Sequence, residues 1–363
     1  MVETRGFAAM AADLRSFAPL SFQRYAPGDC DVCFDIQYCG MCHTDVHFVK
    51  NELGGAQYPM IPGHELIGRV TAVGSQVTKL AVGDNVGVGC MVDSCLQCDD
   101  CKQGYEQYCS GGGSTGTYGG VAAHGRCGEK GRRTMGGYSN KMVVHEHFAV
   151  KVPKDVDLAV CAPLLCAGIT MYEPLCEHGC KEGGKRVGVA GLGGLGMMGI
   201  KLAAAMGCEV TAISTSPQKE QAAKAMGAAR FIDSRDEAAL AAAAGSLDVI
   251  LDTISAPHGY MPFIHMLATH GTLVMLGLGL APQPLVCLPF LVAHKSLTAS
   301  RWCAKASLIG GLPRTQEMMD FCCEKQVFPE VEVIGPERVA ECLEKLDRGN
   351  DSIKRFVLDC SKL

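Results

Sequence analysis

The sequence lacks the features that would place it on a nucleic acid or in a membrane. Its formal net charge is only −5 at pH 7, and it has no long basic block that could follow a phosphate backbone. No apolar run approaches the roughly 20 residues that a membrane-spanning helix needs. The first 25 residues mix acidic and basic side chains with short apolar pieces, which excludes a secretory signal peptide and argues against a transit peptide. We therefore expect a cytoplasmic protein.

The length and composition indicate a globular chain of more than one domain. The 363 residues exceed the size of an ordinary single domain, so two domains are the starting expectation. Hydrophobic residues make up 48% and charged residues 20%, which supplies ample material for a buried core.

The 21 cysteines are unusually many for a chain without an export signal. In a reducing compartment, metal binding is a better explanation for them than disulfides. Cys95, Cys98 and Cys101 recur at intervals of three, and Cys109 follows eight residues later. This spacing can fold a loop around one tetrahedral zinc ion in a closed, structural site. Buried cysteines that pack as small hydrophobes are the alternative, but the intervening residues are polar and loop-like.

A second group of possible metal ligands is dispersed along the chain. Cys42 follows a strand-like alternating stretch, His64 and Glu65 follow a Pro-Gly turn, and Cys166 lies near the start of a helical segment. Each residue alone is as easily explained by packing. Spacing by itself therefore leaves both readings open, a metal site or ordinary buried residues.

The segment 185–196 has the pattern of a dinucleotide-binding turn. A short apolar strand runs into Gly191-x-Gly193-x-x-Gly196, an Ala-rich helical segment follows, and residues 209–213 form the next strand. In this context the glycines allow a tight turn and let the backbone approach a pyrophosphate at the helix N-terminus. A simple strand-to-helix turn is the alternative.

The residues after the second strand of this unit indicate which dinucleotide is preferred. Enzymes that bind NAD place Asp or Glu there to bind the adenosine ribose. This chain has Ser214, Thr215 and Ser216, with Lys219 shortly after. Hydroxyls and an ammonium are compatible with a 2′-phosphate, whereas a carboxylate would repel it. NADP(H) is therefore favoured, and an ordinary polar turn is the alternative.

The pattern of elements predicts two domains of different class. Strands alternate with helical segments in the middle of the chain, which predicts an α/β domain with a doubly wound parallel sheet. Residues 20–150 instead are rich in Gly and short alternating segments, as in a mostly β domain. The segments 315–325 and 354–359 leave the nucleotide-binding pattern and are expected to return to the first domain. We predict a catalytic domain of residues 1–160 completed by 310–363, and a nucleotide-binding domain of residues 161–309.

These motifs, in this order, resemble those of the medium-chain zinc alcohol dehydrogenases. The resemblance is carried by Cys42-His-Thr44-Asp45, Gly-His64-Glu65, the four-cysteine loop and the glycine motif. Leu-Leu-Cys-Ala-Gly-Ile-Thr at 164–170 and Ser-Thr-Ser at 214–216 resemble the cinnamyl alcohol dehydrogenase subgroup. The resemblance covers essentially the whole chain. It implies a GroES-like catalytic domain, a Rossmann domain, NADP(H), two zinc ions and a homodimer acting on primary alcohols or on cinnamyl-type, other aromatic, allylic or aliphatic aldehydes.

The same resemblance implies two zinc sites. Cys42, His64 and Cys166 would hold the catalytic ion, which polarises an aldehyde carbonyl and lowers the pKa of a bound alcohol. Glu65 would alternate with water or substrate as the fourth ligand. The Cys-Ala-Gly-Ile-Thr pattern selects Cys166 over the nearby Cys161. The structural ion would be bound by Cys95, Cys98, Cys101 and Cys109.

Further roles follow from the resemblance. Asp45 would orient the His64 ring. Thr44 would accept the alcohol proton and pass it through the nicotinamide ribose to His47 at the surface. The implied cofactor contacts are Thr44, Thr170, Gly191, Leu192, Gly193, Gly194, Leu195, Gly196, Ser214, Thr215, Ser216, Lys219, Thr253, Gly277, Ser307, Leu308 and Ile309.

The sequence departs from the family pattern near the expected substrate pocket. Glu52 stands where the family often continues its proton relay with Asp. The segments 121–134 and 298–306 are longer than expected, and both should flank the pocket. Cys303 in the second segment lies beside Arg301 and Lys305, and such cations make a thiol more reactive. We expect Cys303 to be a reactive thiol whose modification blocks the pocket, and most other cysteines outside the zinc sites to be buried fillers.

Two other functions remain open at this point. An NAD-linked polyol dehydrogenase has the same fold, although an acidic residue at position 214 would have favoured it. A non-catalytic, redox-regulated zinc-binding protein would account for the surplus of cysteines. Metal content separates these classes, because such a module needs one zinc ion and the dehydrogenase needs two.

Overall fold

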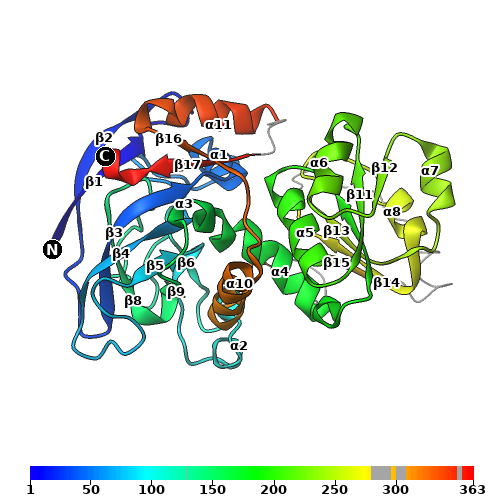
Figure 1. Cartoon of the computed structure of the whole chain (residues 1–363). Coiled ribbons are helices and arrows are strands. Elements are labelled where there is room, and N and C mark those ends of the chain that lie inside the picture. Colours follow the sequence, from blue (N-terminus) through cyan, green and yellow to red (C-terminus); the bar gives the residue numbers. More distant parts are fainter. Residues whose placement is uncertain (129, 279–295, 300–307, 350–353) are drawn as a thin grey trace. The chain divides into compact units, whose positions relative to one another are not determined.

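A computed structural model of the chain contains two compact units. Unit 1 comprises Met1–Cys166 together with Gly310–Leu363, and unit 2 comprises Ala167–Ile309. Each unit has its own sheet and its own core (Figure 1). The residues that the structure describes are 1–128, 130–278, 296–299, 308–349 and 354–363.

Unit 1 is built mainly of β-strands. They are β1 (Val2–Ala9), β2 (Phe17–Arg24), β3 (Asp31–Gly40), β4 (Leu66–Val73), β5 (Asn85–Val88), β6 (Met91–Asp93), β7 (Thr115–Gly116), β8 (Lys141–His145), β9 (Val150–Val152), β16 (Val331–Ile334) and β17 (Arg355–Asp359). The largest sheet has the order β16-β17-β3-β4-β5-β9, and β8 also pairs with β3. Strand β17, from the end of the chain, thus lies against β3 from its beginning.

Unit 1 also contains helices between its strands. They are α1 (His43–Val49), α2 (Asp99–Lys102), α3 (Leu158–Cys161), α10 (Leu312–Lys325) and α11 (Val339–Asp347), with 3-10 turns η1 (Glu106–Tyr108), η2 (Glu146–Phe148), η3 (Ala162–Leu165), η6 (Pro336–Arg338) and η7 (Cys360–Lys362). The domain boundary predicted after residue 160 falls inside α3. Both α3 and η3 contact β3 and β4, so unit 1 continues through Cys166.

The pairing of β3 with β4 positions the candidate active site. Apolar side chains of β3 such as Phe34 and Ile36 are buried and alternate with exposed Asp35, as expected for a half-buried strand. A Cβ on Gly68 of β4 would lie 1.9 Å from the Asp35 carbonyl oxygen, so only glycine allows this approach. Because the strands are antiparallel, the end of β3 lies beside the start of β4. The segments that follow and precede them therefore meet.

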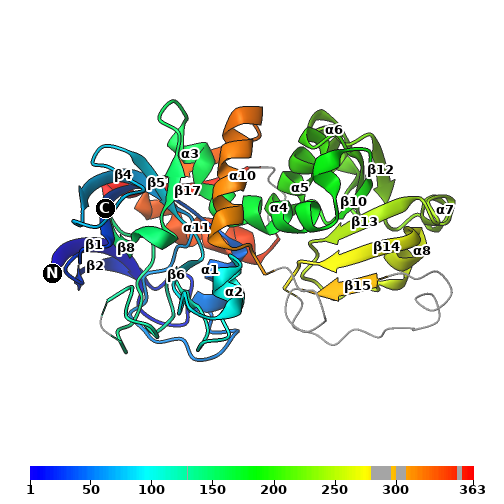
Figure 2. The same ribbon diagram turned by 90° about the horizontal axis from the view of Figure 1, so that it is seen from below.

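Unit 2 confirms the doubly wound parallel sheet. Its order is β12-β11-β10-β13-β14-β15, and every pair is parallel (Figure 2). The order reverses between β10 and β13, and ligands of such sheets bind at the carboxyl ends of strands at this switch point. The strands are β10 (Arg186–Ala190), β11 (Glu209–Ser214), β12 (Arg230–Asp233), β13 (Leu247–Asp252), β14 (Leu267–Met275) and β15 (Ser296–Ala299).

Helices cover this parallel sheet, and α5 packs on β10, β11 and β13. Residues of β10, β11, β12, β13 and β14 form an apolar core cluster together with α8. In the described part of the chain, no single helix has the length and apolar character needed to cross a bilayer, and only the bent pair Leu158–Leu165 and Ala167–Glu177 meets both criteria together. The helices of unit 2 are α4 (Ala167–Glu177), α5 (Gly194–Ala205), α6 (Glu220–Ala225), α7 (Glu237–Ala242) and α8 (Met261–Met266), with η4 (Cys180–Glu182) and η5 (Pro217–Lys219).

Candidate active site and zinc centres

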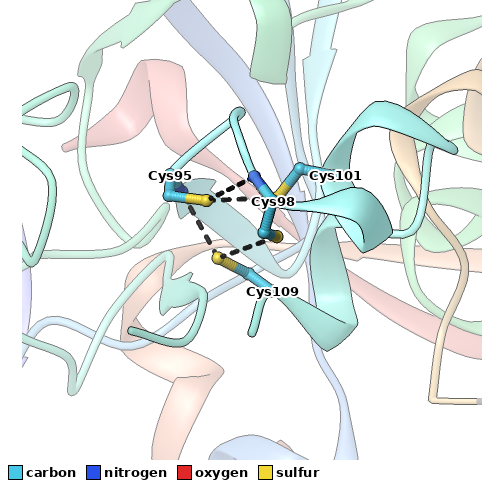
Figure 3. A group of neighbouring side chains, drawn as sticks. All are labelled: Cys95, Cys98, Cys101 and Cys109. Atoms are coloured by element: carbon cyan, nitrogen blue, oxygen red, sulfur yellow. Dashed lines mark hydrogen bonds between the residues drawn. The ribbon is translucent and has the colours of Figure 1, made fainter. Parts of the chain in front are cut away.

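The four-cysteine loop brings its sulfurs together around one point (Figure 3). Cys98 caps the N-terminus of α2, Cys101 lies within that helix, and Cys109 follows η1. The Cys95 and Cys101 sulfurs lie 3.9 Å apart, and those of Cys98 and Cys109 lie 4.0 Å apart. Sulfurs at the corners of a tetrahedral zinc site stand roughly 3.8 Å apart, because each Zn–S bond is about 2.3 Å. The loop therefore fits a closed four-thiolate zinc site.

Backbone amides in the same loop point at the sulfurs. The Cys95 sulfur accepts from the Cys98 and Gln97 N–H groups at 3.2 and 3.4 Å, and the Cys109 sulfur accepts from the Cys95 N–H at 3.4 Å. The backbone N–H of Cys101 lowers the pKa of the Cys98 thiol to about 5. Such donors stabilise the thiolate form, which is the form that binds metal.

The long segment 121–134 folds against this cysteine loop. An isolated antiparallel bridge joins Val121 to Arg133, and the backbone N–H of Ala122 donates to the Arg132 carbonyl. The Arg126 guanidinium donates to the Cys95 carbonyl at 3.1 Å, and a ring nitrogen of His124 lies 2.9 Å from the Gly113 carbonyl. These contacts join the segment to both ends of the cysteine loop, and its place beside the substrate pocket stays a prediction.

A second cluster gathers Cys42, His64, Glu65 and Cys166, all within unit 1. One ligand atom from each lies within 4.8 Å of those of the others, and the two sulfurs are 3.9 Å apart. Cys42 caps α1, the His-Glu pair precedes β4, and Cys166 lies between η3 and α4. Cys161 is fully buried and lies outside the cluster. Its thiol forms a hydrogen bond with the thiol of Cys323 on α10 instead.

Two buried atoms of this cluster fit a metal ion. His64 Nε2 and Glu65 Oε2 have no hydrogen-bond partner among the described groups, although His64 is only 4% exposed and Glu65 is fully buried. A buried polar atom without a partner costs free energy, so such atoms usually face an ion or a ligand. Two thiols, one imidazole and one carboxylate are the donors that zinc prefers. The second cluster therefore fits zinc as well.

Asp45 holds the surroundings of this cluster in place. Its carboxylate lies 3.2 Å from His64 Nδ1 and accepts from the Cys42 backbone N–H at 3.0 Å. The hydroxyl of Tyr118 donates to it at 2.6 Å and that of Tyr138 at 3.2 Å. Because Nδ1 faces a carboxylate, it carries the ring proton and leaves the Nε2 lone pair for a metal. The sequence predicted Asp45 at this position but indicated neither tyrosine.

Two further residues beside the cluster were missed from the sequence. Arg355 of β17 donates to Glu65 Oε1 at 2.5 Å. Burial raises the pKa of the Glu65 carboxyl to about 7, and the Arg355 guanidinium opposes this rise. Cys90 also lies beside the cluster. A hydrogen bond with the Cys166 thiol lowers the pKa of the Cys90 thiol. Both come from segments whose sequence carries no ligand-like spacing.

The predicted proton-relay residues lie on and after α1. The Thr44 hydroxyl lies 3.5 Å from the Cys42 sulfur. His47 Nδ1 lies 2.5 Å from Glu52 Oε2, and Lys50 forms an ion pair with the same carboxylate. The expectation that His47 lies at the surface was wrong. It is only 8% exposed, and Glu52, with 29% of its side chain exposed, lies nearer to solvent.

The glycine turn of unit 2 has the space that a dinucleotide requires. Gly191 has a φ of +85°, which side-chain-bearing residues rarely adopt. A Cβ on Gly196 would lie 1.8 Å from the Gly191 carbonyl oxygen, so this position also requires glycine. A Cβ on Gly193 would meet nothing within 4 Å, and α5 begins directly after it. The turn therefore offers open space in front of the N–H groups that begin the helix, which suits a pyrophosphate.

The hydroxyl residues after β11 differ in exposure: Ser214 is buried and Thr215 is exposed. Ser214 is 8% exposed, and its hydroxyl oxygen accepts from the Ser216 backbone N–H at 3.1 Å. Thr215 is exposed, and the Lys219 ammonium donates to the Leu192 carbonyl of the glycine turn at 3.1 Å. The Lys219 bond thus joins this segment directly to the glycine turn.

Most of the remaining residues proposed to contact the cofactor lie in the part of the chain that the structure describes. Thr170 lies in the first turns of α4, and the Thr253 hydroxyl donates to the Gly191 carbonyl at 2.9 Å. A Cβ on Gly277 would lie 2.2 Å from the Ile254 carbonyl oxygen, so the turn after β14 requires glycine there. Leu308 is 39% exposed, and Ile309 has a φ of +47°. Ser307 and Cys303 lie outside the described residues.

Known proteins are similar to this chain in sequence and in fold. Residues 28–154 match the family model of the alcohol dehydrogenase GroES-like domain, and residues 194–322 match that of the zinc-binding dehydrogenases. The chain is 45% identical over 340 residues to an NADP-dependent alcohol dehydrogenase C of Mycolicibacterium smegmatis, covering 94% of this chain and 93% of the relative. The chain belongs to the zinc-containing medium-chain alcohol dehydrogenases. The predicted family is confirmed.

Solved structures place this dehydrogenase close to the cinnamyl alcohol dehydrogenase group. The cinnamyl alcohol dehydrogenase of Sorghum bicolor is 40% identical, with a TM-score of 0.91 over 99% of this chain and 98% of the other. The enzyme of that type from Helicobacter pylori, solved with NADP(H), is 37% identical, with a TM-score of 0.88 over 99% of each chain. The GroES-like and Rossmann domains predicted from the sequence are confirmed.

Proposed function

We propose that the chain is an NADP(H)-dependent alcohol dehydrogenase and aldehyde reductase of the cinnamyl alcohol dehydrogenase type. The cluster of Cys42, His64, Glu65 and Cys166, with its unpartnered His64 Nε2, carries the proposal. The relatives support the cofactor, since one is named for NADP dependence and another was solved with NADP(H). The substrates are primary alcohols and cinnamyl-type, other aromatic, allylic or aliphatic aldehydes.

Cys42, His64, Glu65 and Cys166 would hold the catalytic zinc, which would supply a Lewis acid for the substrate oxygen. Asp45 keeps the His64 ring in the tautomer whose Nε2 faces the cluster, and Arg355 favours the charged form of Glu65 against the effect of burial. The Thr44 hydroxyl, beside Cys42, accepts the proton that an alcohol loses on oxidation. His47 and Glu52, bonded at 2.5 Å, hold that proton nearer to solvent.

Metal content tests this function against a non-catalytic zinc module. We expect two zinc ions per chain, one in each cluster, and one fewer when Cys42 and Cys166 are both replaced by Ser. Replacing Cys30 and Cys33, which lie outside both clusters, should leave two. A purified chain that binds one zinc ion, and only through the four-cysteine loop, would favour the module instead.

The cofactor preference is tested by Ser214→Asp. A carboxylate there can still accept the Ser216 N–H, so the turn is kept, but it repels the 2′-phosphate. We expect the discrimination in favour of NADPH over NADH to fall by about 2–4 kcal/mol, because a charge-assisted hydrogen bond to the phosphate is replaced by a repulsion. The measurement is kcat/KM for both cofactors. Ala238→Asp, which adds the same charge at an exposed position of α7, should leave the ratio unchanged. A wild type that already prefers NADH would contradict the assignment.

The role of Thr44 is tested by a pair of variants. Thr44→Val keeps the side-chain shape but removes the hydroxyl, and we expect kcat for alcohol oxidation to fall by roughly 10²-fold, the scale of proton-transfer catalysis. Thr44→Ser keeps the hydroxyl and should retain most of the rate. Equal losses in both variants would show that packing, and not proton transfer, accounts for the effect.

A further inference from the structure

The turn after β13 is tied down by one carboxylate. Asp252, the last residue of the strand, is 2% exposed, and its Oδ1 accepts from the Ile254 backbone N–H at 3.0 Å. Its carbonyl accepts from the backbone N–H groups of Leu276 and Gly277 at 2.8 and 3.0 Å. Asp252 thus joins the carboxyl ends of β13 and β14, and its side chain shapes the turn that follows β13.

This turn forms one wall of the glycine turn. The Thr253 hydroxyl donates to the carbonyls of Ala190 and Gly191, both at 2.9 Å. A Cβ on Gly191 would lie 2.8 Å from the Thr253 hydroxyl oxygen and 2.9 Å from Ile254 Cγ1. Strands β10 and β13 are neighbours where the strand order reverses, so the two turns face the crevice in which such sheets bind dinucleotides. A displacement of Thr253 or Ile254 would therefore alter the cofactor site.

His258 holds Asp252 in a way that requires a charged ring. Its Nε2 lies 2.8 Å from Asp252 Oδ2, and its Nδ1 lies 2.8 Å from the Ala256 carbonyl oxygen. Both partners are acceptors, so both ring nitrogens must donate, and only the imidazolium has two N–H groups. A neutral ring loses one of these bonds whichever tautomer it adopts.

The surroundings of His258 are consistent with a retained charge. The bond to Asp252 is the main cause that raises the pKa of His258 above its usual value, while burial opposes it. Tyr260 and Phe263 pack around the ring, and Tyr260 stays neutral near pH 7 because burial raises the pKa of its hydroxyl. Asp252 and Tyr260 are the titratable groups that face the ring in the described part of the chain.

We propose that the His258 imidazolium is a positioning group for the dinucleotide site. It clamps Asp252, keeps Thr253 and Ile254 against the glycine turn, and so favours the conformation that binds NADP(H). Loss of the ring proton releases one of the two bonds and weakens cofactor binding. The inference rests on the proposed use of NADP(H), and it assigns to His258 a role in binding without any contact with the reacting atoms.

The sign of the pH effect follows from the direction of the shift. A group whose pKa is higher in the folded state contributes fully below its unfolded value and loses that contribution as the pH rises through the folded value. The clamp is therefore complete in mildly acidic solution and loses one of its two hydrogen bonds at alkaline pH. Cofactor affinity should fall across the same interval.

The test is the dissociation constant of NADPH, measured by its fluorescence on the zinc-loaded full chain from about pH 6 to about pH 9, the range in which histidines titrate. We expect His258→Gln to bind NADPH roughly tenfold more weakly than wild type at the acidic end, the size of one charge-assisted hydrogen bond. The two proteins should converge at the alkaline end. His265→Gln, an exposed histidine on α8, is the control and should follow wild type throughout.

A second variant keeps the inference testable if His258→Gln unfolds. Asp252→Asn removes the charge that His258 clamps, and the double variant should bind no more weakly than Asp252→Asn alone. Thermal unfolding of each variant shows whether the fold is kept. A constant ratio between wild type and His258→Gln across the pH range, or additive effects in the double variant, would overturn the inference. Failure of the wild type to bind NADPH at any pH would instead overturn the proposed function.

Discussion

Cys42→Ser and Cys166→Ser are each expected to lower kcat/KM for aldehyde reduction by roughly 10³-fold or more, since a metal Lewis acid supplies several kcal/mol of transition-state stabilisation. Cys42 and Cys166 present sulfurs 3.9 Å apart to the same point as His64 Nε2. Serine is a poor zinc ligand, so either change removes one of the two soft donors. The measurement is steady-state kinetics together with zinc content.

Cys161→Ser is the matched control for this prediction. Cys161 lies in the same segment of the chain, is fully buried, and stands outside the cluster. Its replacement should leave kcat/KM within a few-fold of wild type. Thermal unfolding should show that all three variants keep the fold, because the cluster lies between segments already held by β3 and β4. A Cys42→Ser enzyme with normal kcat would refute the catalytic-site assignment.

Cys101→Ser is expected to impair folding itself. Structural zinc contributes directly to folding free energy, about 10–16 kcal/mol in zinc-finger peptides, so losing one of four ligands should cost about 3 kcal/mol or more. Cys101 is 6% exposed and lies in α2, whose conformation depends on the loop around it. Urea unfolding measures the loss, and chelator treatment of wild type should reproduce it.

The control for Cys101→Ser is Cys30→Ser, a partly exposed position on the same unit and outside both clusters. It should change the free energy of unfolding by less than about 0.5 kcal/mol, as is usual for surface substitutions. Cys101→Ser and Cys42→Ser should also differ in which properties they change. Cys101→Ser should lower soluble yield and thermal stability together with activity, whereas Cys42→Ser should lower activity alone. Equal stability of Cys101→Ser and wild type would contradict a structural role for this site.

The sequence was sufficient where function depends on local pattern. The glycine turn was identified because strand, Gly-x-Gly-x-x-Gly and helix follow one another within a short segment, and β10, α5 and β11 lie where that pattern indicated. The four cysteines were identified for the same reason, since all lie within one loop. In both cases the residues that act together are neighbours along the chain.

The sequence was insufficient where long-range packing decides. Arg355 reaches Glu65 across 290 positions, and Tyr118 and Tyr138 reach Asp45 across 73 and 93. Such contacts depend on how strands pair, which neither periodicity nor spacing encodes. The error over His47 has the same origin, because the exposure of a side chain on a helix depends on what packs around it in the folded chain.

The proposed enzyme activity is tested most directly by initial rates of NADPH and NADH oxidation with a panel of aliphatic, allylic and cinnamyl aldehydes, measured on the zinc-loaded chain. We predict turnover of several aldehydes with NADPH, a clear preference for NADPH over NADH, and loss of turnover when zinc is removed by a chelator. Turnover that prefers NADH with polyols, or no dependence of the rate on zinc, would contradict the proposed function.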